Sequence, residues 1–171
     1  MGDIIMNYAQ VRKFDVTNGP NIRTTLFVSG CTHKCEGCFN EEQQDFNYGN
    51  EFTKETEEEF IKYSLNPQIK GINILGGEPM QQIMDDTLLN LLKRLNAEVK
   101  KPIWLWSGYT FDEIIQNPKR LELLKQVDVL IDGQFQIDKR DIMLKYRGSS
   151  NQRVIDVKKS LIDNKVTEIE L

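Results

Sequence analysis

The chain has 171 residues, of which 39% are hydrophobic and 28% charged, a size and balance typical of one globular domain rather than a disordered chain. The net charge of −4 at pH 7 disfavours nucleic-acid binding through a broad basic face. No run approaches the roughly 20 apolar residues of a membrane span, and the N-terminus lacks the apolar segment of a signal peptide. We therefore expect an intracellular, cytoplasmic protein that binds neither nucleic acid nor membranes.

The first half of the chain predicts two strands separated by a loop and a helix. Residues 24–30 form a short apolar, β-branched run that stops at a glycine, as a strand does. A loop with all three cysteines follows. Residues 53–65 have helical periodicity, and Thr56 and Glu59 have the spacing of a capping box. Residues 71–77 then predict the second strand.

The next segments continue this alternation. Residues 85–98 predict a helix opened by Asp85 or Asp86, with four leucines on one face. Residues 103–108 predict a third strand. Thr110 then opens a further helix, three residues before a capping-box glutamate.

The last third predicts one more helical piece and two more strands. Pro118 is expected to break the preceding helix before a piece that runs through Leu124. Residues 127–133 and 152–157 predict the fourth and fifth strands. Residues 158–171 are polar, and we expect them to form a peripheral tail of a single domain over residues 1–171.

Strand–helix alternation predicts an α/β fold with parallel strands and right-handed crossovers. Such sheets place their chemistry at the carboxyl ends of the strands, and the unusual residues of this chain fall at those ends. They are Cys31, Cys35 and Cys38 after the first strand, Gly76, Gly77, Glu78 and Pro79 after the second, Ser107 and Gly108 after the third, and Asp132 and Gly133 after the fourth. We expect all four sets to meet at one edge of one sheet.

The segment "CTHKCEGC" at residues 31–38 contains every cysteine of the chain. In a reducing compartment, clustered cysteines indicate metal binding or catalysis rather than disulfides. Structural zinc needs a fourth ligand. His33 could supply it, but it lies in a three-residue gap between two ligands, where its ring would point away. His33 is otherwise expected to be an exposed loop residue. A [4Fe–4S] cluster held by three thiolates instead leaves one iron open to substrate.

The C-x3-C-x2-C spacing resembles the signature of the radical S-adenosylmethionine superfamily. The resemblance implies that Cys31, Cys35 and Cys38 bind the cluster, and that the open iron chelates the methionine end of S-adenosyl-L-methionine. Cleavage of the sulfonium then gives a 5′-deoxyadenosyl radical. The superfamily usually has an aromatic residue before the third cysteine, where this chain has Gly37. Phe39 is a candidate to pack the adenine, and a core role is the alternative.

The same resemblance assigns roles at the other strand ends. Gly76, Gly77 and Glu78 match a Gly-Gly-Glu motif that holds the methionine amino group, and small glycines would let the backbone approach a ligand. Ser107 and Asp132 would face the ribose and the methionine carboxylate. Each of these two could equally be a turn former or a helix cap.

Longer segments resemble the anaerobic ribonucleoside-triphosphate reductase activating proteins. They are "NGPNIRTTLFVSGCTHKCEGCFN" (18–40), "VDVLIDGQF" (127–135) and "RGSSNQRVIDV" (147–157). Asn21 stands where that family has glycine, and asparagine is the least costly replacement if the turn needs a positive φ. The similarity runs from about Asn7 to Val157.

This resemblance implies a fold, partners and an activity. The fold is an incomplete TIM-type barrel with its site at the carboxyl ends of parallel strands. A flavodoxin-type donor supplies the electron, and a glycyl radical forms on the large subunit of the anaerobic reductase. Activation of another glycyl-radical enzyme, such as pyruvate formate-lyase, is one alternative. A non-catalytic zinc or iron–sulfur binding module is the other.

Overall fold

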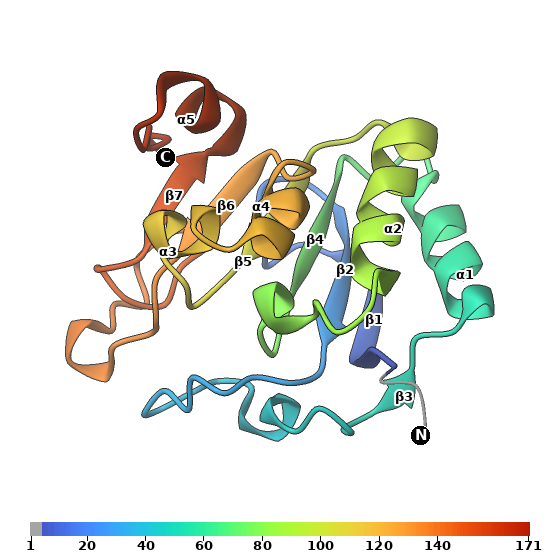
Figure 1. Ribbon diagram of the computed structural model, residues 1–171, viewed down its shortest axis with the longest axis horizontal. Helices are drawn as coiled ribbons and strands as arrows, with labels where there is room; N and C mark the ends of the chain where they lie inside the picture. Colours follow the sequence, from blue (N-terminus) through green and yellow to red (C-terminus); the bar gives the residue numbers. More distant parts are fainter. Residues whose placement is uncertain (1–4) are drawn as a thin grey trace.

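The computed structural model describes residues 5–171, and a seven-stranded mixed sheet forms its centre, in the order β3-β1-β2-β4-β5-β6-β7 (Figure 1). The strands are β1 (Asn7–Asp15), β2 (Arg23–Val28), β3 (Asn50–Glu51), β4 (Gly71–Gly76), β5 (Ile103–Trp106), β6 (Val129–Asp132) and β7 (Arg153–Asp156). The four central strands β2, β4, β5 and β6 pair in parallel, as the alternation predicts. The incomplete TIM-type barrel stays a prediction.

The strands that flank the central four, β1 and β7, run antiparallel to them, and the short edge strand β3 runs in the direction of the central strands. β1 pairs antiparallel with β2 and with β3 at one edge, and β7 pairs antiparallel with β6 at the other. The segment between β6 and β7 has a single 3₁₀ turn, η4 (Ile137–Lys139), and no crossover helix. Because no helix carries the chain back along the sheet, β7 returns beside β6 in the opposite direction.

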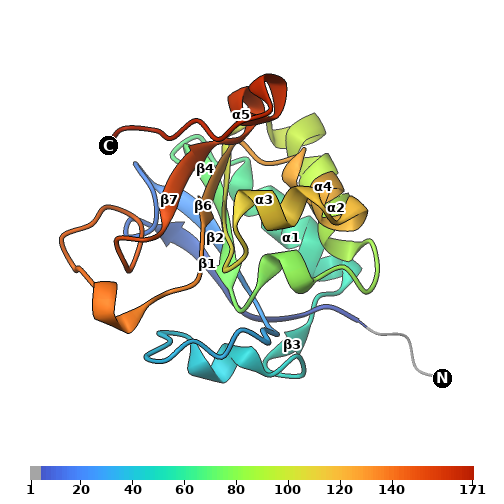
Figure 2. The same cartoon turned by 60° about the vertical axis from the view of Figure 1, so that its left-hand side comes forward.

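Helices α1 to α4 lie on one side of the sheet (Figures 1 and 2). The helices are α1 (Lys54–Ser64), α2 (Thr87–Arg94), α3 (Phe111–Ile115), α4 (Pro118–Leu124) and α5 (Val157–Asp163), and shorter turns are η1 (Glu41–Gln44), η2 (Pro79–Gln81) and the π-helical η3 (Leu95–Val99). The predicted helices are therefore present, and Pro118 occupies the first turn of α4.

The helix starts test the capping predictions. The capping box of Thr110 and Glu113 is present at α3. The box predicted at Thr56 is wrong, because α1 begins earlier: the Thr53 side chain accepts a hydrogen bond from the backbone N–H of Thr56. At α2 the side chain of Asp85 accepts from the backbone N–H of Thr87 at 3.0 Å.

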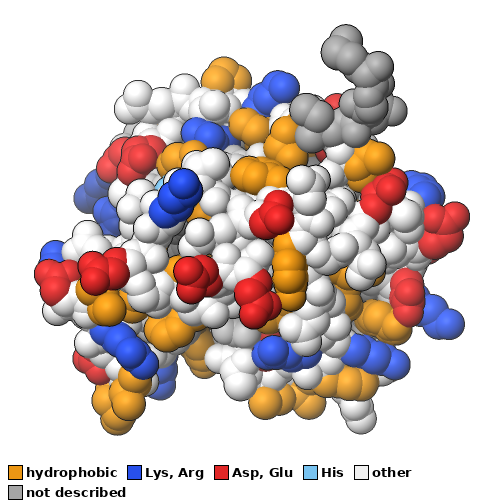
Figure 3. Space-filling model, turned by 90° about the horizontal axis from the view of Figure 1, so that it is seen from below, with side chains coloured by type: hydrophobic (Ala, Val, Ile, Leu, Met, Phe, Trp, Pro, Cys, Tyr) orange, Lys and Arg blue, Asp and Glu red, His pale blue; other side chains and the backbone are white. Residues whose placement is uncertain are grey.

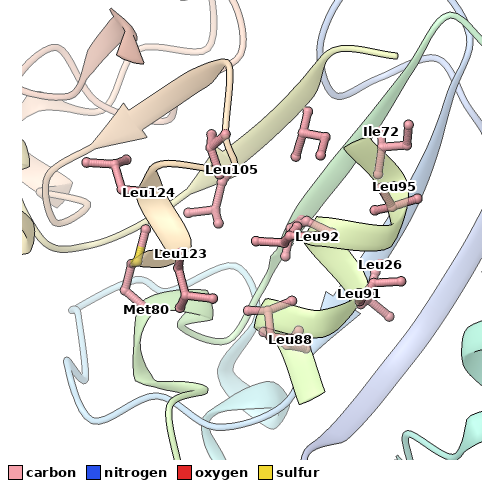
Figure 4. Close-up of a cluster of buried hydrophobic side chains, with 14 of the residues drawn as sticks. Leu26, Ile72, Met80, Leu88, Leu91, Leu92, Leu95, Leu105, Leu123 and Leu124 are labelled. Carbon is pink, nitrogen blue, oxygen red and sulfur yellow. The ribbon is translucent and has the colours of Figure 1, made fainter. Parts of the chain in front are cut away.

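The main hydrophobic core lies between this helical layer and the sheet. Figure 4 shows leucines of α2 and α4 packed towards strand residues such as Leu26, Ile72 and Leu105. The four leucines predicted on one face of the second helix, Leu88, Leu91, Leu92 and Leu95, are all fully buried. This packing fixes the central strands relative to one another, and hence the loops at their carboxyl ends.

The structure contains three elements that the sequence did not predict, namely β1, β3 and α5. β1 and β3 extend the sheet beyond β2, and most of α5 lies within the expected peripheral segment 158–171. Ser160 of α5 is fully buried, and Glu168 forms a β-bridge with Ile155. Across residues 5–171, no helix combines the length and apolar character needed to cross a membrane.

Candidate functional site

A cavity of about 580 Å³ lies at the carboxyl ends of the four central strands. Its floor consists of Phe27, Leu75, Trp106 and Ile131, one from each of β2, β4, β5 and β6. Because side chains alternate along a strand, these four lie on the sheet face opposite the main helical core. The predicted convergence of strand ends is therefore present in the structure.

Figure 3 views the molecule from below Figure 1, from the side on which the segment with the three cysteines lies. Basic, acidic and hydrophobic side chains are interspersed on this face. The basic side chains that line the cavity are Arg12, Lys34, Arg140 and Arg147, and the acidic ones are Glu78 and Asp141. The cavity is thus more cationic than the chain as a whole.

The three cysteines line this cavity together. Cys31, Cys35 and Cys38 are free thiols, each partly exposed. Burial raises the pKa of Cys31 to about 11, and burial also raises the pKa of Cys35. The thiols of Cys31 and Cys35 are therefore protonated at neutral pH in the metal-free protein. A metal binds the thiolate form, so its binding releases these protons.

The donor set fits an iron–sulfur cube better than a single ion. Among residues 5–171, no three His, Cys, Asp or Glu side chains converge on a position for one metal ion. A cube distributes its cysteine ligands over different irons, so three thiols spread along one loop around a cavity fit it.

Backbone geometry explains why this loop has glycine at position 37, where the superfamily usually has an aromatic residue. Gly37 has φ +75°, a region that bulky side chains avoid. A Cβ there would also lie 2.9 Å from Cδ1 of Ile137. Gly37 does not line the cavity, whereas Phe39 does. Phe39 is 64% exposed, so the alternative core role is wrong, and its ring lies 5.0 Å from that of Phe135.

The segment at the end of β4, residues 76–79, is called the glycine loop here, and residues 30–40 are called the cysteine loop. The two loops pack directly against each other. The backbone N–H of Gly77 donates to the Val28 carbonyl and that of Glu78 to the Gly30 carbonyl, both at 2.8 Å. A Cβ on Gly77 would lie 2.7 Å from the Gly30 carbonyl oxygen. Gly76 and Gly77 both line the cavity, and the absence of a side chain on Gly77 lets two backbones meet beside it.

Glu78 is the most constrained of the predicted site residues. It is 1% exposed and accepts hydrogen bonds from His33, Ser107, Gly108 and Met80. Oε1 accepts from Nε2 of His33 at 2.7 Å and from the backbone N–H of Gly108 at 2.6 Å. Oε2 accepts from Oγ of Ser107 at 2.8 Å and from the backbone N–H of Met80 at 2.9 Å.

The structure separates Ser107 from Asp132. Ser107 lines the cavity beside Glu78. Asp132 is not among the cavity-lining residues; its carboxylate accepts from the backbone N–H of Phe111 at 2.8 Å and forms an ion pair with Arg153 at 2.6 Å. Ile131 and Gly133, on either side of Asp132, line the cavity, and the alternation of the strand turns Asp132 to the other face, toward the start of α3.

His33 and Arg147 are two of the cavity residues that the sequence did not mark as site residues. His33, expected to be exposed, has a side chain only 8% exposed. Arg147 lines the cavity, and its Nε is buried with no hydrogen-bond partner among the described residues. The sequence marked each of them only by position. His33 lies between two cysteines, and Arg147 is the first residue of a segment that resembles the activating proteins.

Comparisons with known proteins show the family of this chain. Residues 17–155 match the family described as a 4Fe-4S single cluster domain. The chain is 42% identical over 152 residues to the anaerobic ribonucleoside-triphosphate reductase-activating protein of Escherichia coli K12, covering 87% of this chain and 97% of that protein. The proteins of the same name from Vibrio cholerae and from phage T4 are 41% and 40% identical over 150 residues. These alignments cover 86% and 87% of this chain, and 96% and 93% of the respective relatives. This chain therefore belongs to the 4Fe-4S single cluster domain family and to the family of anaerobic ribonucleoside-triphosphate reductase-activating proteins.

Proposed function

We propose that this chain is an enzyme that activates an anaerobic ribonucleoside-triphosphate reductase by generating a glycyl radical on its large subunit. The observation that carries the proposal is the meeting of three free cysteines with the glycine loop at one cavity. The names of the relatives give the target. The resemblance to the radical S-adenosylmethionine superfamily adds S-adenosyl-L-methionine as the second cofactor.

In this proposal the thiolates of Cys31, Cys35 and Cys38 would hold a [4Fe–4S] cluster. When bound, the cluster and S-adenosyl-L-methionine would supply, with one electron from the donor, the reductive chemistry that takes a hydrogen atom from a glycine Cα of the partner and leaves methionine and 5′-deoxyadenosine. No side chain of this protein needs to act as a general acid or base.

The remaining cavity residues have binding and shielding roles. The apolar floor, including Trp106, excludes water from the reacting centre. The exposed ring of Phe39 beside Phe135 offers an aromatic surface for adenine. The unpaired Nε of Arg147 is suited to a carboxylate, because a guanidinium binds that group with charge-assisted hydrogen bonds.

The proposal also includes an electron donor and a fold. A flavodoxin-type protein is the proposed electron donor, because reduction of the cluster needs a low-potential donor comparable to plant-type ferredoxins at about −400 mV. The mixed sheet is an incomplete TIM-type barrel, and its open edge admits a glycine-bearing segment of the partner.

The test is anaerobic reconstitution with iron and sulfide, followed by dithionite reduction in the presence of S-adenosyl-L-methionine. We expect 5′-deoxyadenosine. We also expect a glycyl radical, detected by electron paramagnetic resonance, when the reductase large subunit is added but not when pyruvate formate-lyase is added. A colourless protein that carries zinc without iron or sulfide would instead support the non-catalytic module.

A further inference from the structure

The imidazole of His33 joins the cysteine loop to the glycine loop. His33 lies between Cys31 and Cys35, and its Nε2–H donates to Oε1 of Glu78 at 2.7 Å. The side chains are 8% and 1% exposed, respectively. Because water is largely excluded from both groups, this hydrogen bond is stronger than one on the surface, and its loss would leave a buried carboxylate oxygen short of a partner.

The same imidazole contacts the segments that follow the other two central strands. After β5, the Tyr109 ring meets it edge-on at 4.6 Å between centroids. A Cβ on Gly108 would lie 2.7 Å from Cδ2 of His33. After β6, the Gln134 amide donates to Nδ1 at 3.2 Å. His33 therefore lies where the segments after β2, β4, β5 and β6 meet.

The hydrogen bonds of Glu78 leave its carboxylate little capacity for a further partner. Its two oxygens accept from four donors of the protein, and an ionised carboxylate has about four lone-pair sites. A cofactor ammonium could reach these oxygens only by displacing one of those donors. The arrangement therefore suits Glu78 to holding loops together rather than to direct contact with a ligand.

We propose that His33 is a positioning residue that, through Glu78, fixes the cysteine loop relative to the glycine loop. The inference rests on the proposed function, because it concerns the placement of the cluster ligands beside the cofactor-binding loop. Other contacts keep the cysteine loop in the fold when His33 is changed. The backbone N–H of Thr32 donates to Oε1 of Gln81 at 2.9 Å, and that of Cys31 donates to the Gln44 carbonyl at 3.0 Å.

The first measurement uses the metal-free protein. We compare alkylation of the loop cysteines by iodoacetamide, followed by mass spectrometry, in the wild type, His33→Ala and His33→Gln. Loss of the contact should raise the alkylation rate about threefold or more in His33→Ala, because the loop opens more often. His33→Gln keeps an N–H donor for Glu78 and should return the rate toward the wild-type value.

The second measurement uses anaerobically reconstituted protein. The affinity for S-adenosyl-L-methionine is followed by the change that this cofactor causes in the electron paramagnetic resonance signal of the reduced cluster. We expect His33→Ala to keep wild-type iron content and to bind the cofactor about tenfold more weakly. His33→Gln should recover most of this affinity.

Glu36→Ala is the matched control, because Glu36 is an exposed residue of the same loop that does not line the cavity. Wild-type alkylation and affinity in His33→Ala would overturn the proposal, as would iron loss in that variant or a failure of His33→Gln to improve on it. If His33→Ala does not fold, His33→Phe keeps a ring against Tyr109 but lacks the N–H donor for Glu78, and it should show the same two effects. If the wild type itself takes up no cluster, the proposed function fails, and the alkylation rates still decide the role of His33.

Discussion

Cys35 occupies the middle of the proposed ligand set. The backbone N–H of Cys38 donates to the Cys35 carbonyl at 3.2 Å, so these two thiols extend from one tight turn of the loop. Alanine at position 35 leaves only two thiolates, which cannot hold three corners of a cube. We expect Cys35→Ala, after anaerobic reconstitution, to lose the cluster and to form no 5′-deoxyadenosine. Iron and sulfide analysis measures the cluster content, and chromatography measures the 5′-deoxyadenosine formed.

Glu36→Ala serves again as the control for the loop, and it should keep the iron content and the product. Formation of 5′-deoxyadenosine by Cys35→Ala would show that the ligand assignment is wrong.

Single residues show where sequence reasoning succeeds and where it stops. Asn21 has φ 65°, as expected for an asparagine in place of a turn glycine, because that argument depends only on the local backbone. The prediction for His33 failed because its partner Glu78 lies 45 residues further along the chain. A sequence pattern places both residues at one sheet edge, but it does not show which side chains pair there.

At the scale of elements, Asp132 connects three of them: it ends β6, caps α3 through Phe111 and pairs with Arg153 of β7. Asp132→Ala leaves a backbone N–H and a partly buried guanidinium without their partner. We expect it to lower the free energy of unfolding by about 2 kcal/mol, measured by urea denaturation of the metal-free protein. Because Asp132 does not line the cavity, the affinity for S-adenosyl-L-methionine should stay at the wild-type value.

Asp112→Ala is the control for this change, since Asp112 is an exposed acid in the first turn of α3. A large loss of cofactor affinity in Asp132→Ala at unchanged stability would restore the ligand role that the resemblance implies.

The elements differ in how well their sequences predict them. The central strands were predicted because they are apolar on both faces, as buried parallel strands are. β1 was missed because most of its residues are polar or only partly buried, so neither alternation nor a continuous apolar run marks it. Its strand conformation depends on pairing with β2 and β3, which the local sequence does not contain.

At the scale of the whole molecule, Asp15 makes stability depend on pH. Burial alone would raise the pKa of this carboxyl, but hydrogen bonds from Thr25, Asn18 and Thr17 outweigh it and lower the pKa from 3.8 to about 2. As pH falls, the unfolded chain therefore takes up this proton before the folded protein does. The stabilisation is complete above about pH 5 and is lost as pH falls toward 2, by about 1 kcal/mol at pH 3.

Asp15→Asn removes this titration while keeping the shape of the side chain. The variant should be less stable than the wild type at pH 7, because an amide cannot accept all the hydrogen bonds made to the carboxylate. The difference in the free energy of unfolding between the two proteins should shrink by about 1 kcal/mol from pH 7 to pH 3. Urea denaturation of the metal-free proteins at both pH values measures it, with the exposed Asp112→Asn as the control for losing one carboxylate. A difference that stays constant between the two pH values would show that Asp15 does not carry the acid sensitivity, since every other group titrates alike in both proteins.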